Sequence, residues 1–186
     1  MSPQARHVKF TYEDYLLFPD DGKRHELIDG EHHVTPAPNI KHQKISGNLF
    51  GILHAHLRGV KAGRLFSAPT DVVLSDLDVV QPDLLFVSAG RASIITERNI
   101  QGAPDIVAEI LSETTRRTDE VVKRKLYERF GVAEYWIVDP ELETVKVYRM
   151  AETGYIRTAE LTRETGDILK SPFLPGFQLS LGELFD

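Results

Sequence analysis

Asp83 and Glu109 are the two acidic residues of this sequence most suited to chemistry. Each lies in an apolar segment typical of a buried strand, Asp83 within residues 79–87 and Glu109 within residues 105–111. A carboxylate in such a strand is unfavourable unless a metal ion or a cationic side chain pairs with it. Because sequential strands usually lie side by side, the two carboxylates could bind one hard cation such as Mg²⁺. In the alternative, structural interpretation, Asp83 caps a turn after Pro82 and Glu109 pairs with an arginine.

Lys123 is the basic residue that helical geometry places closest to these acids. Residues 119–130 are predicted to form a helix whose core-facing apolar stripe recurs at i, i+4 and i+8 from Val122. At about 100° per residue, Lys123 lies about 60° from the centre of this stripe, closer than either basic residue that follows it. Lys123 can therefore lean toward the sheet. Its ordinary alternative is an i, i+4 ion pair with Asp119.

Basic residues concentrate before and within this predicted helix, in a chain whose formal net charge is −6. A phosphate-bearing ligand would suit this local charge, although acidic residues are interspersed and a solvated helix face explains the same pattern. The acidic net charge argues against coating of nucleic acid by the field of the whole protein. The sequence has no cysteine, which excludes disulfides, thiolate metal sites and cysteine catalysis.

An α/β order of elements would position these residues. A short helix (12–18) and a hairpin (24–29 and 31–34) come first, and a long helix from residue 40 to about 61 follows Asn39 as its N-cap. The further elements are strands within 63–74, 79–87 and 105–111, a polar excursion over 88–102, the helix 119–130, a strand at 135–138, an antiparallel pair at 144–149 and 155–161, and an apolar tail over 169–186. This order predicts an α/β fold with a mixed β-sheet flanked by helices.

The length of 186 residues fits one domain spanning residues 1–186, with its core at about residues 40–140. The sequence has no apolar run near the roughly 20 residues of a membrane span, and its first residues lack the apolar centre of a signal peptide. We therefore expect a soluble, cytoplasmic protein with no membrane partner.

A combination of motifs extends over most of the chain. Its members are HELIDGE (25–31), His42, QPDLLFV (81–87), PDIVAEILS (104–112), Asp119, Lys123, Tyr127 and GVAEYWIVDP (131–140). Together they are far more specific than any one of them alone. The combination resembles the putative restriction endonuclease family of bacterial proteins, within the PD-(D/E)XK nuclease superfamily.

The resemblance implies an αβββαβ core of helix, three strands, helix and strand, which is the order expected from residue 40 onward. It also implies that Asp83 and Glu109 are the metal-binding acids, with the carbonyl of Ile110 as a further ligand. The superfamily usually places its lysine two residues after the glutamate, where this chain has Leu111. In this family the lysine has moved to the following helix, which points to Lys123.

The implied activity is Mg²⁺-dependent hydrolysis of phosphodiester bonds in DNA, with Mn²⁺ as a substitute metal. Lys123 would position or help deprotonate the attacking water, or stabilise phosphate oxygens, and burial would lower its pKa. Glu26 matches an early acidic position of the family and would complete the site or orient a water. Tyr127 and His42 would support the site.

Arg116 and Arg117, in the loop before the second major helix, would contact the backbone of duplex DNA. Cutting both strands needs two sites, so a homodimer is a further expectation. The competing hypothesis is a non-catalytic nucleic-acid- or protein-binding domain that keeps the nuclease fold.

Overall fold

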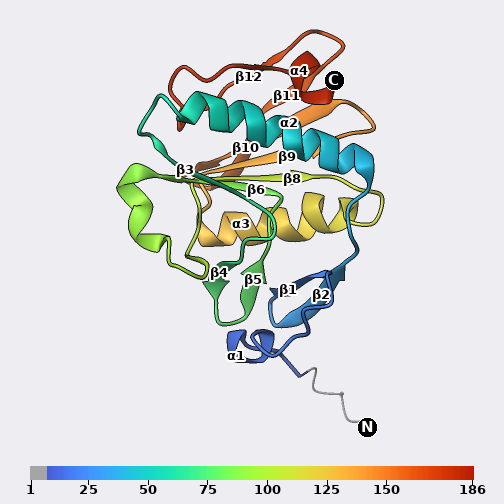
Figure 1. Ribbon diagram of the computed structural model, residues 1–186, viewed down its shortest axis with the longest axis vertical. Coiled ribbons are helices and arrows are strands. Elements are labelled where there is room, and N and C mark those ends of the chain that lie inside the picture. The colour runs from blue at the N-terminus through green and yellow to red at the C-terminus, as the bar shows by residue number, and fades with distance from the viewer. Residues whose placement is uncertain (1–7) are drawn as a thin grey trace.

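A six-stranded mixed sheet forms the centre of the structure, a computed structural model that describes residues 8–186 (Figure 1). Its strand order is β11-β10-β9-β8-β6-β3. The strands are β3 (Gly63–Ser67), β6 (Leu84–Ser88), β8 (Ile106–Ile110), β9 (Glu134–Asp139), β10 (Thr144–Ala151) and β11 (Gly154–Thr162). Strands β8 and β9 run parallel, and the other neighbouring pairs are antiparallel. The parallel pair requires a crossover, which the helical segment between β8 and β9 provides.

Helix α2 (Ile40–Leu57) covers one face of this sheet and helix α3 (Arg124–Phe130) covers the other (Figure 1). Ile45, Leu49 and Leu53 of α2 recur every four residues and are buried against the sheet, as predicted. The helix ends before residue 61, its predicted end. In chain order, α2, β3, β6, β8, α3 and β9 form the expected αβββαβ core, and the predicted fold class is confirmed.

A second, five-stranded sheet lies on the α3 side of the main sheet (Figure 1). Its order is β2-β1-β5-β4-β7, and the strands are β1 (Arg24–Ile28), β2 (Glu31–Thr35), β4 (Val72–Ser75), β5 (Asp78–Val80) and β7 (Ile100–Gln101). The predicted hairpin is confirmed as β1 and β2, and β1 also pairs with β5 through Leu27 and Val79. The hairpin therefore belongs to this second sheet and not to the main one, and the sequence did not reveal that there are two sheets.

The segment predicted as one strand over residues 79–87 is two strands in two different sheets. Strand β5 belongs to the smaller sheet, and β6 begins the main-sheet ladder at Leu84. Pro82 lies between them and has no N–H to donate to a ladder, so the chain leaves one sheet and enters the other at this point. Asp83 therefore lies at the entry to β6 and not inside a strand.

The predicted helix over residues 119–130 begins with a π-helical turn, η2 (Thr118–Lys123), which leads directly into α3. Asp119 and Lys123 lie on the inner face of this wide turn, and both are buried. Val122, predicted to face the core, is 37% exposed, so this part of the predicted stripe is wrong. An α-helical phase does not hold across a π turn, because each π turn contains more residues.

Smaller elements complete the fold. These are α1 (Tyr12–Tyr15), η1 (Ala89–Ile94), β12 (Ile168–Leu169), β13 (Leu179–Ser180) and α4 (Leu181–Phe185), of which β12 and β13 pair in a separate two-stranded sheet. As predicted, the apolar tail covers the sheet, and Phe177 and Leu184 join the core cluster beside α2. No helix within residues 8–186 is long and apolar enough to cross a membrane.

Candidate active site

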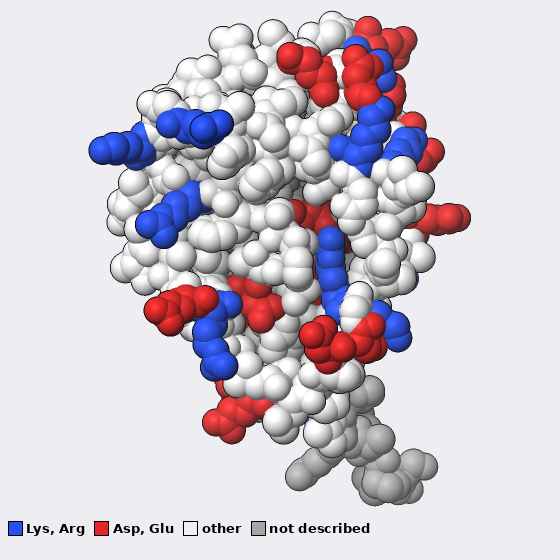
Figure 2. All heavy atoms as spheres, in the orientation of Figure 1, with Lys and Arg blue, Asp and Glu red and all other residues white. Residues whose placement is uncertain are grey.

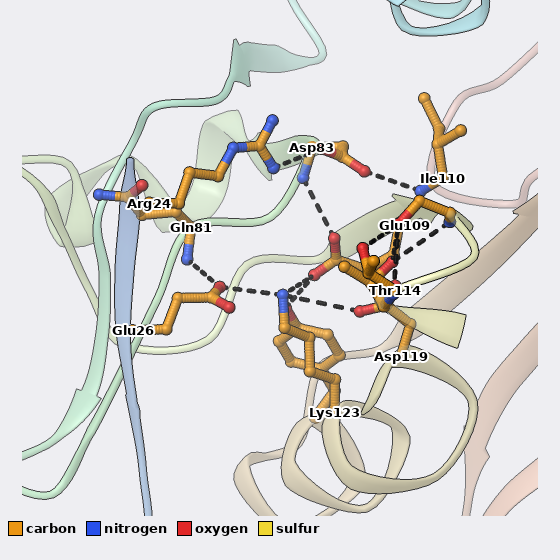
Figure 3. A network of polar contacts seen from close by, with 12 residues as sticks. Arg24, Glu26, Gln81, Asp83, Glu109, Ile110, Thr114, Asp119 and Lys123 are labelled. Atoms are coloured by element: carbon orange, nitrogen blue, oxygen red, sulfur yellow. Dashed lines mark hydrogen bonds and ion pairs between the residues drawn. The ribbon is translucent and has the colours of Figure 1, made fainter. Parts of the chain in front are cut away.

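A cavity of about 230 Å³ opens where the hairpin, η2, the start of β6 and the end of β8 meet (Figure 3). Strands β6 and β8 are antiparallel, so the start of one and the end of the other lie at the same edge of the sheet. The predicted residues that line the cavity are Glu26, His42, Asp83, Glu109, Ile110 and Lys123. Residues from distant parts of the sequence therefore converge on one site.

The Lys123 ammonium lies among three carboxylates. Its Nζ is 2.9 Å from Glu26 Oε1, 3.0 Å from Glu109 Oε1 and 3.7 Å from Asp119 Oδ1 (Figure 3). Burial acts to lower the pKa of Lys123, but these carboxylates raise it well above its ordinary value. The predicted lowering of this pKa is wrong, because burial alone was considered. Lys123 is a fixed cation at neutral pH.

Glu109 is buried at the centre of the network. Its Oε1 accepts hydrogen bonds from the Tyr127 hydroxyl at 2.7 Å and from Lys123, and its Oε2 accepts a long one of 3.4 Å from the Asp83 N–H. Burial, together with the charges of Asp119 and other acids, raises the pKa of Glu109 to about 8 against the opposing effect of Lys123. Burial likewise raises the pKa of Asp119 to about 6. The site therefore contains more carboxyl groups than its own cations can keep ionised.

Asp83 has the opposite character, because three donors surround its carboxylate. Arg24 Nη1 lies 2.6 Å from Oδ1, and Oδ2 accepts from the Ile110 N–H at 2.8 Å and lies 3.0 Å from His42 Nε2. Burial acts to raise the pKa of Asp83, but His42, Arg24 and the Ile110 N–H lower it to about 2. Asp83 is therefore ionised, and His42 supports it as a direct neighbour.

Glu26 reaches the site from β1, in the smaller sheet. Its Oε1 accepts from Lys123 and from the Gln81 N–H at 2.7 Å. The Gln81 side chain donates in turn to Asp71 at 2.8 Å and to the Tyr15 hydroxyl at 3.2 Å. The connection between β5 and β6 thus fixes the position of Glu26 relative to Lys123.

Arg24 is the main site residue that the sequence did not single out. Its side chain is 21% exposed and pairs with Asp83. A signal was available, because Arg24 lies two residues before Glu26 and alternate residues of a strand share one face. Asp119, which the sequence offered as an ion-pair partner of Lys123 and as part of the motif combination, also lines the cavity.

The two predicted DNA contacts differ in their surroundings. Both terminal nitrogens of Arg116 are bound by Asp139, at 2.6 Å and 3.1 Å. This guanidinium is therefore committed to a contact within the protein. Arg117 is exposed and makes no ion pair with any residue of 8–186.

The fold and this site define a class of protein. A helix, three antiparallel strands, a helix and a parallel strand, with two acids and a lysine at one edge of the sheet, form a restriction-endonuclease-like nuclease fold. A family model described as Uma2, putative restriction endonuclease, matches residues 12–182. The chain belongs to this family.

A solved structure supports the same fold. The chain is similar to a putative nuclease belonging to DUF820 from Anabaena variabilis ATCC 29413, with a TM-score of 0.79 and 23% sequence identity. The similarity covers 95% of this chain and 97% of that one. No curated protein matches the sequence. Family membership and fold together support a nuclease.

Proposed function

We propose that the protein is a divalent-metal-dependent endonuclease that hydrolyses phosphodiester bonds in duplex DNA. The observation that carries the proposal is the contact network of Asp83, Glu109 and Lys123 around one cavity. Asp83 N–H reaches Glu109 at 3.4 Å, and Lys123 reaches Glu109 at 3.0 Å. Two acids and a fixed cation at this spacing suit the binding of a metal ion and a phosphate group.

The donor atoms of the site fit a hard cation such as Mg²⁺. Asp83 and Glu109 supply carboxylate oxygens, and the Ile110 N–H points at Asp83. The N–H and C=O of one residue in an extended strand point to the same side, so the Ile110 carbonyl is a suitable third oxygen. When bound, Mg²⁺ would lower the pKa of a coordinated water and offset charge that grows on the phosphate.

No group of three acidic or histidine side chains within residues 8–186 already has the arrangement of a metal site. This is compatible with Mg²⁺, which usually keeps several waters and takes only one or two protein carboxylates. Burial and the neighbouring acids raise the pKa of Glu109 although Lys123 lies 3.0 Å away, so a further cation would stabilise the ionised carboxylate. The residues present therefore fit the ion that the nuclease fold generally uses.

The chain's own residues would do the remaining work. Lys123 is held protonated by its three carboxylate neighbours, so we assign it to orienting the attacked phosphate or the water rather than to proton abstraction. Glu26 restrains the ammonium, and Tyr127 restrains Glu109 through its 2.7 Å hydrogen bond. These contacts keep the reactive groups in place before substrate arrives.

A plasmid assay tests the proposal. Purified protein is incubated with supercoiled plasmid in Mg²⁺, Mn²⁺ or EDTA, with a single-stranded RNA and a duplex RNA of matched length alongside. Nicked and linear plasmid in Mg²⁺ or Mn²⁺, absent in EDTA, is the expected result. Intact plasmid with every metal would overturn the proposal. Cleavage of RNA but not of plasmid would mean that the substrate is RNA and not DNA.

The second candidate is a non-catalytic nucleic-acid- or protein-binding domain with a nuclease fold. It is favoured by one observation, namely that Arg24 and Lys123 already pair with the acids that would hold the metal. Calorimetric titration with Mn²⁺ separates the two candidates. A purely structural network binds no Mn²⁺ that depends on Asp83.

Arg24 competes with a metal ion for Asp83, and its removal should strengthen metal binding. A hydrogen bond between charged groups contributes about 1.5–3 kcal/mol, so Arg24→Met should lower the Kd for Mn²⁺ about tenfold. Isothermal titration calorimetry measures this directly. Arg157→Met, which removes an exposed arginine paired with Glu160, is the matched control and should leave the Kd unchanged. Equal affinities in wild type and Arg24→Met would refute the competition.

A further inference from the structure

The charges of this acidic protein are unevenly distributed along the chain. Residues 32–70 contain five Lys or Arg residues and no Asp or Glu. This segment of formal charge +5 leaves −11 for the rest of a chain whose total is −6. It comprises β2 after its first residue, all of α2, all of β3 and most of the loop from β3 to β4. One helix and its neighbouring edge strand are therefore cationic in a negatively charged molecule.

Most of these cations are unpaired. Lys41 pairs with Glu141, but Lys44, Arg58, Lys61 and Arg64 are exposed and make no ion pair within residues 8–186. Arg58 and Arg64 line the same shallow hollow between the C-terminal end of α2 and β3. In Figure 2, Lys and Arg side chains gather on the left of the view, over the C-terminal end of α2 and β3, away from acidic side chains.

The exposed face of α2 between Lys44 and Arg58 carries two glycines, Gly47 and Gly51, followed by His54 next to Arg58. Lys44, Gly47, Gly51 and Arg58 recur at intervals of three, four and seven residues, so they lie on one side of the helix. A Cβ added at Gly47 or Gly51 would meet no heavy atom within 4 Å. Packing within the chain therefore does not require glycine here, although glycine disfavours a helix relative to alanine. A close approach by the backbone of a partner would account for both residues.

We propose that this α2–β3 basic surface, formed by Lys44, Gly47, Gly51, Arg58, Lys61 and Arg64, binds the phosphate backbone of the nucleic acid that flanks the cleavage site. The inference rests on the proposed function and adds where its substrate lies. Phosphates complement unpaired cations, and the small residues let a sugar-phosphate backbone approach the helix. The surface offers charge and shape but no cluster of base-reading side chains, so its contribution is independent of base sequence.

A second copy of the chain fits this surface less well than nucleic acid. A two-fold symmetric contact centred on the two glycines would bring the α2–β3 basic surface of one copy against the same surface of the other. Lys44 and Arg58 would then face cations of the partner, with no acidic residue of the segment to offset the repulsion. The charge pattern therefore selects a polyanion.

The length of α2 sets the position of the contact along the substrate. The first turn of the helix lies at the candidate active site, where His42 contacts Asp83. Its 18 residues span about 27 Å to the end that carries Arg58. Phosphates of one DNA strand are spaced about 3.4 Å along the axis, so on a duplex that lies along α2, Arg58 and Arg64 contact the backbone about 8 base pairs from the scissile bond, whereas Lys44 lies beside the active site.

Charge reversal tests the surface directly. Fluorescence anisotropy with a 30-base-pair duplex in EDTA measures binding without cleavage. Arg58→Glu/Arg64→Glu should raise the Kd about 30-fold, and the log–log salt slope should fall by about 2, because each lost phosphate contact removes about 0.9. Lys125→Glu/Lys170→Glu reverses two exposed, unpaired cations elsewhere and gives the same net charge. An equal loss in this control would overturn the proposal.

A second variant gives readouts of opposite sign. Gly51→Ala should raise the melting temperature, because alanine favours the helix, and should weaken duplex binding, because its methyl group separates the helix from the phosphates. Unchanged or tighter binding by the stabilised variant contradicts the close approach. Loss of a wild-type dimer in Arg58→Glu/Arg64→Glu, seen by sedimentation, would instead make this face a subunit interface.

Cleavage of substrates of graded length separates this inference from the proposed function. With at least 10 base pairs on the α2 side, Arg58→Glu/Arg64→Glu should raise KM and leave kcat unchanged. With about 4 base pairs there, wild type and variant should have the same KM, because a duplex this short does not reach Arg58 or Arg64. If the wild type neither binds nor cuts any substrate, the proposed function is wrong. If wild type and Arg58→Glu/Arg64→Glu have equal KM values on the long substrates, only the proposed basic surface is wrong.

Discussion

Replacing Glu109 with glutamine is expected to lower plasmid cleavage by about 10³-fold while leaving the protein as stable as wild type. The catalytic loss follows from removal of a charged oxygen ligand and of the negative charge that would hold the metal ion. Stability should be retained because burial already raises the pKa of Glu109 to about 8. The neutral amide resembles the protonated side chain that the buried site favours, and its oxygen can still accept the Tyr127 hydrogen bond. We expect the unfolding free energy to change by no more than about 1 kcal/mol.

Asp83→Asn supplies the contrast. It should lower cleavage as strongly as Glu109→Gln does, but it should also destabilise the fold by about 2–3 kcal/mol, because one charge-assisted hydrogen bond is lost. Whichever way the amide points, its NH₂ group faces a donor, either Arg24 or the Ile110 N–H. Quantitative nicking assays and urea denaturation measure the two effects. Full cleavage activity in Glu109→Gln would remove this residue from the mechanism.

Replacing Lys123 with methionine is expected to abolish cleavage and to destabilise the protein by about 3–5 kcal/mol at pH 8. The methionine leaves Glu26, Glu109 and Asp119 buried without the cation that lies 2.9 to 3.7 Å from them. The folded-state pKa values of Glu109 and Asp119 then rise further above their unfolded values of about 4. The folded variant therefore binds protons more tightly than folded wild type. Its loss of stability relative to wild type is smallest below pH 4 and grows as the pH rises through about 6 and 8, the wild-type pKa values of Asp119 and Glu109.

Denaturant unfolding of wild type and Lys123→Met from pH 4 to pH 9 measures this dependence. Lys125→Met removes an exposed lysine of the same helical segment and should change stability by about 0.5 kcal/mol or less at every pH. A deficit that is independent of pH would mean that the lysine contributes by packing and not by charge. Retained cleavage by Lys123→Met would assign the phosphate-orienting role to another group.

The predictable parts of the fold are those with a strong local pattern. The stripe of α2, the Asp29-Gly30 turn and the apolar run of β8 all have the predicted structure. Each depends on residues within a few positions of one another, which a single sequence displays. The pairing of β1 with β5 depends instead on distant segments, so the second sheet could not be read from the pattern.

The site shows the same division. Asp83, Glu109 and Lys123 stand out because each is a charge in an apolar or helical context, and they do meet in one cavity. The raised pKa of Lys123 results from three carboxylates that come from different parts of the chain. Arg24 was overlooked because its partner lies 59 residues away. Residue types were readable from the sequence, whereas the balance of charge among them required the tertiary structure.

The crossing of the chain from the smaller to the larger sheet at Pro82 has a mechanical consequence. Arg24 and Glu26 belong to the smaller sheet and Glu109 to the larger one, and Asp83 lies in the strap of chain that joins them. A cation held by Asp83 and Glu109 would therefore fasten this strap to the end of β8. The bound cation would hold the two sheets together much as a cross-link does. Metal binding would therefore stabilise the packing of the two sheets, and loosening of that packing would weaken metal binding.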